Sequence, residues 1–352
     1  MIRAGLIGFG LGGRVFHAPL LSSVEGLELA AIVERTTSHT AERYPGIATY
    51  RTLDEMLADT SLSLIVVSTP NDSHFHYAKQ AIEAGRHVVV DKPLCVASGE
   101  ISELMKLAAA RGVMLVPFHN RRFDGDFITV RKLLHDGPLG RLVYFESTMD
   151  RWRPAPTARM PWKNDPAQGG LPQDLGTHLA DQSLALFGKP EAVHAEIKRE
   201  RDGEGASDCF TMWLRYSGFT VVLSANTLGA LERPRYHLRG TRGNYVKRGV
   251  DPQEAALGKV TRIGDGPWGQ EDPNNLGTLC VDVEGSMVTR PVEPIPGDYR
   301  FFYAAIRDAL LGKGPAPVSA VDAWRVARLL EWAAESSEKR CEIACDWSGE
   351  PQ

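Results

Sequence analysis

The feature that most constrains this chain is a glycine-rich turn close to its start. An apolar run over residues 2–7 leads into Gly8-Phe9-Gly10-Leu11-Gly12-Gly13, which matches the G-x-G-x-x-G pattern between a strand and a helix. Gly8 suits a tight turn, Gly10 lets the backbone approach a pyrophosphate, and Gly13 lets the helix pack close to the strand. The amides that open the helix would face phosphate charge. The pattern therefore predicts a dinucleotide site.

An acidic residue follows at the expected distance. Residues 27–33 predict a second strand, and Glu34 at its end is placed to accept both ribose hydroxyls and to repel a 2′-phosphate. Arg35, followed by Thr36, Thr37 and Ser38, would instead serve a 2′-phosphate if the Glu34 side chain turned away. Because the strand end fixes the acid while the arginine lies on a loop, NAD is favoured over NADP as the cofactor.

The first third of the chain alternates apolar runs with amphipathic stretches. Strands are predicted at 62–67, 87–90 and 113–116, and helices at 75–84 and 98–111, which Gly85 and Gly112 end. Continuous apolar strands between helices predict a parallel sheet covered on both faces. A ligand would then lie across the strand ends that follow Ile7, Val33, Val67, Val90 and Val116.

After Phe123 the alternation changes. A helix at 125–135 precedes strands at 140–147, 192–198, 209–216, 220–225, 235–239 and 243–247, then a long loop at 249–275 and helices at 299–311 and 320–336. Strands without an obligatory helix between them predict a mostly antiparallel sheet. The expected fold is α/β: an N-terminal Rossmann doubly wound parallel sheet (1–122) plus a C-terminal α+β domain with a large open sheet (123–352) for substrate binding and oligomerisation.

Composition narrows the classes of partner. The 352 residues carry a formal net charge of -4 with interspersed signs, so no nucleic acid and no membrane surface is expected to bind. The N-terminus enters a strand without a basic and apolar leader, and the five cysteines are scattered with no C-x-x-C pair. These features predict a cytoplasmic protein with free thiols and no metal site.

Two segments at predicted strand ends carry polar groups toward the cofactor groove. Thr69, Pro70, Asn71 and His74 follow one strand, where they fit either a nicotinamide ribose or a capped helix start. Asp91-Lys92-Pro93 follows the next strand. A lysine held there would donate a proton or a hydrogen bond to a substrate oxygen, although a solvated surface lysine is the alternative.

A third segment pairs an acid with an imidazole. Asp174, His178 and Asp181 stand at i, i+4 and i+7 of a predicted helix. Oxidation of an alcohol requires one proton to leave the hydroxyl as hydride leaves carbon, and histidine exchanges protons near neutral pH. Such a pair on a helix is more often structural, but the nucleotide turn and Lys92 favour catalysis here.

With these residues assembled, the whole chain resembles the glucose-fructose oxidoreductase/inositol dehydrogenase family, known as Gfo/Idh/MocA. The resemblance rests on the glycine turn, Thr69-Pro70-Asn71 with His74, Lys92-Pro93, Asn120-Arg121-Arg122-Phe123 and Asp174-Leu175-Gly176-Thr177-His178. Segments 118–124 and 236–240 look most like the branch that includes scyllo-inositol 2-dehydrogenases. The resemblance implies Lys92, Asp174 and His178 as the catalytic set. One departure is Asp91, where the family usually has glutamate.

The expected sites follow from the residues and the resemblance together. Cofactor binding is expected at Gly8, Phe9, Gly10, Leu11, Gly12, Gly13, Glu34, Arg35, Thr69, Pro70, Asn71, His74, Asp91, Lys92 and Asn120. Substrate binding is expected at Lys92, Arg122, Trp152, Arg153, Trp162, Asp174 and His178. The tryptophans would cover an alicyclic ring and the arginines would bind its hydroxyls, although packing on the domain or on another subunit fits them equally well.

The expected function is an NAD(P)-dependent dehydrogenase that reversibly oxidises a secondary hydroxyl of a cyclitol or sugar to the ketone. A homodimer or homotetramer is expected, because an open sheet needs cover. One alternative is a non-catalytic cofactor-binding sensor on the same fold, but such relatives typically lose the lysine or the histidine, and this chain keeps both. Another is a glycosidase that uses NAD transiently, which would need further metal or acid/base ligands.

Overall fold

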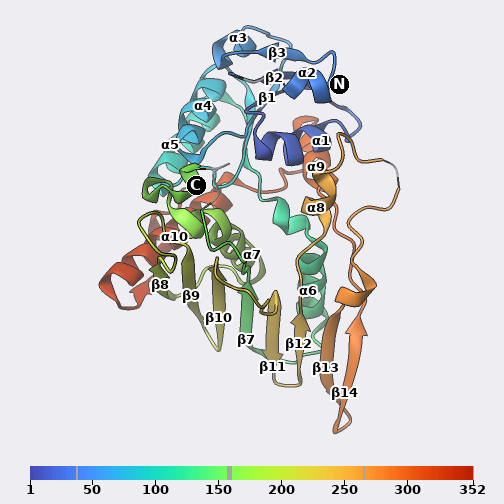
Figure 1. The fold of residues 1–352 in the computed structure, drawn as a ribbon, viewed down its shortest axis with the longest axis vertical. Coiled ribbons are helices and arrows are strands. Elements are labelled where there is room, and N and C mark those ends of the chain that lie inside the picture. Colours follow the sequence, from blue (N-terminus) through green and yellow to red (C-terminus); the bar gives the residue numbers. More distant parts are fainter. Residues whose placement is uncertain (37–38, 157–160, 265, 352) are drawn as a thin grey trace. The chain divides into compact units, whose positions relative to one another are not determined.

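The computed structural model describes residues 1–36, 39–156, 161–264 and 266–351, except for the side chains of residues 161–162. Its contacts divide the chain into two compact units (Figure 1). The first unit comprises Met1–Phe123, Pro252–Trp268 and Asp298–Trp324, and the second comprises Asp124–Asp251, Gly269–Gly297 and Arg325–Gln352. The boundary expected from the sequence, after residue 122, would assign residues 252–268 and 298–324 to the second domain. Apolar side chains of these two segments pack instead in the core of the first unit.

The first unit is built on a six-stranded parallel sheet. Its strands are β1 (Ile2–Ile7), β2 (Leu27–Val33), β3 (Ala48–Tyr50), β4 (Leu64–Val67), β5 (His87–Val90) and β6 (Leu115–Pro117). They are hydrogen-bonded in the order β3-β2-β1-β4-β5-β6. This order confirms the predicted Rossmann sheet, and it reverses direction between β1 and β4. In open parallel sheets the crevice at such a reversal is where nucleotides bind.

The helices of this unit begin and end at recognisable residues. They are α1 (Ala18–Leu21), α2 (His39–Arg43), α3 (Leu53–Leu57), α4 (Asn71–Glu83), α5 (Ser98–Arg111), α8 (Gln253–Leu257) and α9 (Arg300–Leu310), with a 3-10 turn η2 (Asn120–Phe123). Gly112 ends α5 in the left-handed conformation, as predicted (φ 64°). Helix α8 lies where the sequence predicted only a loop, because the buried Leu257 and Ile263 anchor that segment to the core.

The second unit is built on a nine-stranded sheet. Its strands are β7 (Leu142–Thr148), β8 (Ala192–Lys198), β9 (Cys209–Tyr216), β10 (Phe219–Asn226), β11 (Tyr236–Gly240), β12 (Gly243–Lys247), β13 (Gly277–Val283), β14 (Ser286–Val292) and β15 (Ile343–Ala344). Their order is β14-β13-β12-β11-β7-β10-β9-β8-β15. Only the β7–β10 pair is parallel among these strands. The predicted open, mostly antiparallel sheet is confirmed.

Helices cover one face of this second sheet (Figure 1). They are α6 (Gly125–Asp136), α7 (Thr177–Phe187) and the later part of α10 (Ala320–Lys339). Short turns are η3 (Pro161–Asn164), η4 (Pro166–Gln168), η5 (Pro172–Gly176), η6 (Pro273–Asn275) and η7 (Trp347–Gly349). Leu179 and Leu329 pack on strand residues such as Leu214 in the covered core. Within the described residues, no helix is long and apolar enough to cross a membrane.

Candidate active site

The glycine turn has the geometry that a dinucleotide requires. Gly8 adopts a φ of 91°, and a Cβ placed there would lie 2.3 Å from the carbonyl oxygen of Ser68. A Cβ on Gly13 would lie 2.2 Å from the carbonyl oxygen of Gly8. A Cβ on Gly10, by contrast, would meet no atom within 4 Å. Two glycines therefore allow the backbone to pack, while Gly10 leaves open space on the side where a pyrophosphate fits.

A π-helical turn, η1 (Gly13–His17), follows the glycines and carries His17 into the interior. Turns of this kind are rare and occur often at functional sites. The flanking residues differ in exposure: Phe9 is buried with its ring centroid 6.0 Å from that of Tyr44, whereas Leu11 is exposed. The open cradle at Gly10 and the amides that follow it fit the predicted dinucleotide.

Asp91 organises the end of β5 beneath this turn. Its carboxylate accepts hydrogen bonds from the backbone N–H of Lys92 at 2.8 Å and from the Ser68 hydroxyl at 3.1 Å. The Nε2 atom of His17 lies 3.5 Å away. Burial opposes ionisation of Asp91, but contact with His17 and the charge of Lys92 hold the pKa of its carboxyl well below the usual range. Asp91 thus remains charged and fixes the backbone from which Lys92 extends.

A buried tyrosine completes this cluster. The hydroxyl of Tyr303 lies 2.6 Å from Nδ1 of His17, and burial raises the pKa of Tyr303 well above its ordinary value, with the charge of Asp91 adding to the effect. A neutral hydroxyl that donates to Nδ1 leaves the ring proton on Nε2, which faces Asp91. Sequence reasoning missed His17 and Tyr303, although a histidine within the first helical turn after the glycines is a local signal for one of them.

His74 joins two of the predicted cofactor segments. One of its ring nitrogens lies 2.8 Å from the carbonyl oxygen of Pro93, and the other lies 2.8 Å from the carbonyl oxygen of Thr69. His74 is buried, and α4 begins at Asn71 with Pro70 as its N-cap and no side-chain capping bond. His74 therefore ties the strand end after β4 to the Lys92-Pro93 segment, rather than reaching outward as a ligand group.

Glu34 is engaged with the protein itself. Its carboxylate accepts hydrogen bonds from the backbone N–H groups of His39 and Thr40 at 2.9 and 3.0 Å and from the Thr40 hydroxyl at 2.9 Å. The residue is buried, whereas Arg35 is exposed. Thr37 and Ser38, which the sequence offered as phosphate-binding hydroxyls, lie outside the described residues. Both carboxylate oxygens of Glu34 therefore bind residues at the start of α2.

The segment after β6 is held by ion pairs within the first unit. Asn120 is buried. The guanidinium of Arg121 lies 2.5 Å from Glu254, and that of Arg122 lies 3.3 Å from Asp322. Arg122, expected to bind substrate, is thus anchored in the unit that carries the cofactor turn.

In the second unit, Asp174 and His178 occupy a break in helical geometry. Asp174 lies in the π-helical turn η5, and His178 lies in the first turn of α7. The sequence had placed both on one α-helical stripe, which a π turn shifts. Asp174 pairs with Lys163 at 2.9 Å and with Arg151 at 3.6 Å, and His178 is buried. Asp174 and His178 therefore lie four positions apart across the junction of η5 and α7, and Asp174 is the more exposed of the two.

The proposed substrate tryptophans are less well placed. Trp152 is 60% exposed, and the side chain of Trp162 lies outside the described part of the structure. Arg151 and Arg153, on either side of Trp152, line a pocket together with Asp174. The arginines thus lie beside the predicted acid, and Trp152 does not line that pocket.

A buried polar network missed by sequence reasoning supports α7. The guanidinium of Arg235 donates to Gln182 at 2.7 Å, to Tyr236 at 3.0 Å and to Ser147, and it lies 3.6 Å from Asp126. Gln182 is one turn beyond His178 on the same helix. Arg235 therefore links the helix that carries His178 to β11, β7 and α6. An arginine among apolar strand residues is the signal that could have revealed it.

The glycine turn at the reversal point of a parallel sheet defines a protein class, the dinucleotide-binding proteins with a Rossmann unit. A family model described as the oxidoreductase family, NAD-binding Rossmann fold, matches residues 2–119, and that of its C-terminal alpha/beta domain matches residues 131–344. The chain belongs to the Gfo/Idh/MocA oxidoreductase family, as the sequence motifs predicted.

Relatives of similar length support this assignment. The chain is 41% identical to the uncharacterized oxidoreductase YdgJ of Escherichia coli over 344 residues, which are 97% of this chain and 98% of that protein. It is 32% identical to IolW of Bacillus subtilis, a scyllo-inositol 2-dehydrogenase (NADP(+)), over 339 residues, with 96% and 94% covered.

Solved structures show the same fold. YPO2259 from Yersinia pestis has a TM-score of 0.92 and 40% identity, with 97% of each chain covered. The protein yvaA from Bacillus subtilis has a TM-score of 0.93 and 31% identity, with 98% of this chain and 100% of that chain covered. The similarity therefore spans both units.

Proposed function

We propose that this oxidoreductase is an NAD(P)-dependent dehydrogenase that reversibly oxidises a secondary hydroxyl of a cyclitol or sugar to the ketone. The observation that carries the proposal is the anchoring of Lys92 by Asp91 at the end of β5, where a Cβ on Gly12 of the nucleotide turn would lie 2.6 Å from the Asp91 carboxylate. The bond holds the backbone of Lys92 next to the glycine turn, which supports a role for this lysine at the proposed cofactor site. The named activity of IolW, and of IolU at 26% identity, supports the substrate class.

Each proposed role follows from chemistry and from the geometry of its own unit. The bound nicotinamide supplies the hydride acceptor. The Lys92 ammonium stabilises the negative charge that develops on the substrate oxygen. The imidazole of His178 takes the hydroxyl proton in oxidation and returns it in reduction. Asp174, with its charge balanced by Lys163 and Arg151, orients the hydroxyl.

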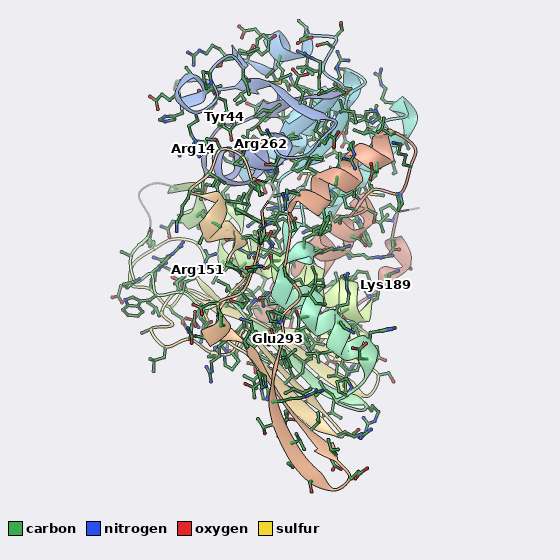
Figure 2. The ribbon with its side chains drawn as sticks, turned by 90° about the vertical axis from the view of Figure 1, so that its right-hand side faces the viewer. Arg14, Tyr44, Arg151, Lys189, Arg262 and Glu293 are labelled. Carbon is green, nitrogen blue, oxygen red and sulfur yellow. The ribbon has the colours of Figure 1, made fainter. Side chains whose placement is uncertain are left out.

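For the cofactor we propose NADP ahead of NAD, although the sequence alone favoured NAD. That preference required a free Glu34 carboxylate, and both of its oxygens accept hydrogen bonds from residues at the start of α2. The positive charge of Arg35 remains exposed at the same strand end. Arg43, the last residue of α2, and Tyr44, which follows it, donate to the carbonyl oxygens of residues 260 and 261, and Arg262 comes next in the chain (Figure 2). These cations favour a 2′-phosphate.

The five cysteines are free thiols, and on that basis we propose the cytoplasm, a reducing compartment, as the site of the reaction.

The competing function is a cofactor-binding sensor without turnover. A screen of inositols, aldoses and their acidic and phosphorylated derivatives with NAD and NADP, followed by the absorbance of the reduced nicotinamide, separates the two. Oxidation of at least one polyol with catalytic turnover is the expected result. Tight cofactor binding without oxidation of any polyol or sugar, in either direction, would instead identify a sensor.

A further inference from the structure

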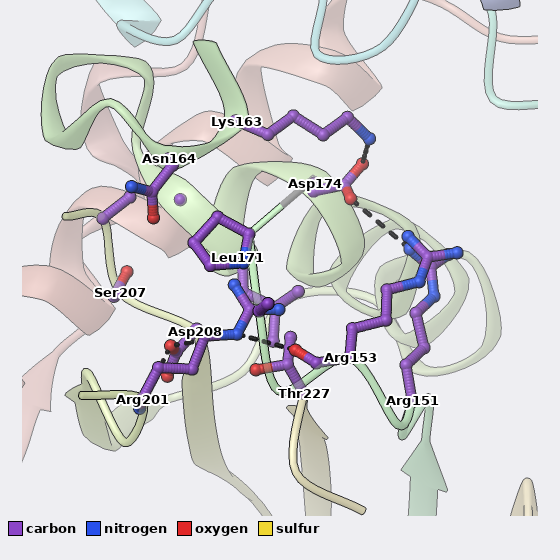
Figure 3. A pocket seen from close by; sticks show the side chains of 14 residues that line it. Arg151, Arg153, Lys163, Asn164, Leu171, Asp174, Arg201, Ser207, Asp208 and Thr227 are labelled. Carbon is purple, nitrogen blue, oxygen red and sulfur yellow. Dashed lines mark hydrogen bonds and ion pairs between the residues drawn. The ribbon is translucent and has the colours of Figure 1, made fainter. Parts of the chain in front are cut away.

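A pocket in the second unit gathers cationic side chains beside Asp174 (Figure 3). It is a hollow that opens to solvent. Four cationic side chains line it, and two carboxylates accompany them. The cations are Arg151, Arg153, Lys163 and Arg201, and the carboxylates are Asp174 and Asp208. Binding of a neutral polyol does not require this excess of positive charge.

The backbone fixes two of these arginines on the same side of the chain. The N–H of Arg151 donates to the carbonyl oxygen of Asn226 at 2.9 Å, and that of Arg153 donates to the carbonyl oxygen of Thr227 at 2.8 Å. Alternate residues of an extended segment point the same way. Arg151 and Arg153 therefore both line the pocket, Arg153 from an exposed position, while the exposed Trp152 between them does not line it.

The carboxylates do not neutralise this charge. Asp208 is buried and lies 3.7 Å from Arg201 and 3.7 Å from Arg199, which does not line the pocket. It also accepts a hydrogen bond from the backbone N–H of Glu200 at 2.7 Å. Asp174 is shared between Lys163 and Arg151. Each carboxylate thus faces two cations, and the pocket keeps a net positive charge.

One buried lining group points to a ligand. Among the described residues, no group hydrogen-bonds the hydroxyl of Thr227, which is 5% exposed, whereas Arg153, which lines the same pocket, is exposed to solvent. Burial lowers the pKa of Arg201, and the charges of Arg199 and Arg153 act in the same direction against Asp208. An oxyanion would relieve this repulsion and supply acceptors for these donors.

We propose that this pocket binds an oxyanion, a carboxylate or a phosphate monoester, carried by the polyhydroxylated substrate. The inference rests on the proposed function, because it places the anionic group on the molecule whose hydroxyl Asp174 orients. Planar guanidinium groups bind both oxyanions through paired hydrogen bonds. The substrate class is therefore an acidic or phosphorylated polyol rather than a neutral one.

Three compounds with one sugar skeleton test this: glucose 6-phosphate, glucuronate and glucose. Isothermal titration of the full chain at low ionic strength, with and without NADP, measures each affinity. At least one of the two anions is expected to bind more than about 10-fold tighter than glucose, because charge-assisted hydrogen bonds add this much affinity. Tighter binding of glucose 6-phosphate indicates a phosphate site, and tighter binding of glucuronate indicates a carboxylate site. Equal affinities for all three compounds overturn the proposal.

Substitutions locate the binding. Arg153→Gln is expected to weaken the preferred anion about 10- to 100-fold, and Arg153→Lys to weaken it less, because lysine keeps the charge without the paired donors. Arg131→Gln, on the exposed side of α6, removes one positive charge outside the pocket and is the matched control. Equal losses in Arg153→Gln and Arg131→Gln show non-specific attraction and overturn the proposal. Circular dichroism confirms that each variant is folded.

Turnover assays on the same samples separate this proposal from the proposed function. Selective anion binding that depends on Arg153, without oxidation of any polyol, leaves the pocket in place and refutes the dehydrogenase. Efficient oxidation of neutral inositols, with no preference for anions and no effect of Arg153→Gln, leaves the dehydrogenase in place and refutes the pocket.

Discussion

The carboxylate of Glu34 accepts two hydrogen bonds from Thr40, one from its backbone N–H at 3.0 Å and one from its hydroxyl at 2.9 Å. The acid therefore stabilises the first turn of α2, where backbone N–H groups lack helical partners. A ribose that recruited Glu34 would have to compete with these bonds. Glu34 lies at the end of β2, where a ribose-binding acid is expected, but its carboxylate is already hydrogen-bonded to residues of the short helix α2.

This relationship predicts the cofactor preference. The wild-type enzyme is expected to have a higher kcat/KM with NADP than with NAD, and Glu34→Ala is expected to leave that ratio unchanged while lowering stability by about 1–3 kcal/mol. Arg35→Ser is expected to lower kcat/KM for NADP about 10-fold or more, with Arg111→Ser at the exposed end of α5 as the control. A strong NAD preference that Glu34→Ala abolishes would restore Glu34 as the ribose-reading residue.

Alanine substitutions at two glycines of the nucleotide turn are expected to have different effects, one on cofactor affinity and the other on thermal stability. Gly10→Ala should fold normally, because its Cβ meets no protein atom within 4 Å, but should bind NADPH more weakly because the methyl group fills the pyrophosphate side. Gly13→Ala should lower the thermal midpoint, because its Cβ would lie 2.2 Å from the Gly8 carbonyl oxygen. Fluorescence titration and thermal denaturation measure the two effects. Normal NADPH affinity in Gly10→Ala would count against the cradle.

Lys92→Met and His178→Ala are expected to remove turnover without removing the cofactor. The loss in kcat should be about 10²–10⁴-fold for His178→Ala, as for other proton-transfer groups. Because neither side chain is proposed to bind the dinucleotide phosphates, the affinity for NADPH should change little. Lys106→Met, on the exposed part of α5, is the control. Wild-type rates in both variants would reject the proposed catalytic set.

Sequence patterns located the strand ends of the first unit well. Ile7, Val33, Val67 and Val90 each end a strand where the apolar runs predicted, because buried parallel strands leave an unmistakable apolar signature. The short strand β3 was missed, since its residues 48–50 are largely exposed and carry no such pattern. Strand β14 was missed for the same reason, since six of its seven residues are exposed, whereas β13, which alternates buried and more exposed residues, was missed although it carries a strand pattern.

The chemistry of the site was only partly readable from the sequence. Lys92, Asp174 and His178 stand out by motif, but some of the contacts that support the elements around them join residues that are remote in the chain. Tyr303 reaches His17 across 286 positions, and Arg235 reaches Gln182 across 53. Such contacts depend on packing in three dimensions, which no local periodicity encodes. The engagement of Glu34 by α2 is local, yet it depends on where a short helix begins, which sequence patterns fix poorly.

The C-terminal tail predicts a pH effect on stability. Hydrogen bonds from Arg325, opposed by partial burial and assisted by Lys189, lower the pKa of Glu350 to about 2. The unfolded value is about 4.3, so the stabilisation is present above that pH and is lost as pH falls toward 2. Glu350→Gln should therefore cost about 1 kcal/mol at pH 7, a value reduced by solvent screening, and less at pH 3.

Urea denaturation at both pH values measures this difference. Glu338→Gln, on an exposed position of α10, is the matched control and should show no such change between the two pH values. A cost for Glu350→Gln that is the same at pH 7 and pH 3 would contradict the assignment.

The uncovered face of the second sheet predicts self-association. Helices bury one face, whereas Tyr144, Trp213 and His237 on the other face are only half-buried. A second copy of this chain can cover such a face through a closed, two-fold contact in which the same surface meets itself. The wild-type protein is therefore expected to be a dimer or tetramer by light scattering at micromolar concentration. Trp213→Glu should shift it toward monomer, because an added charge is costly to desolvate in a contact between two copies, while Glu338→Gln should not. A wild-type monomer at that concentration would show that the half-buried face is stable in water on its own.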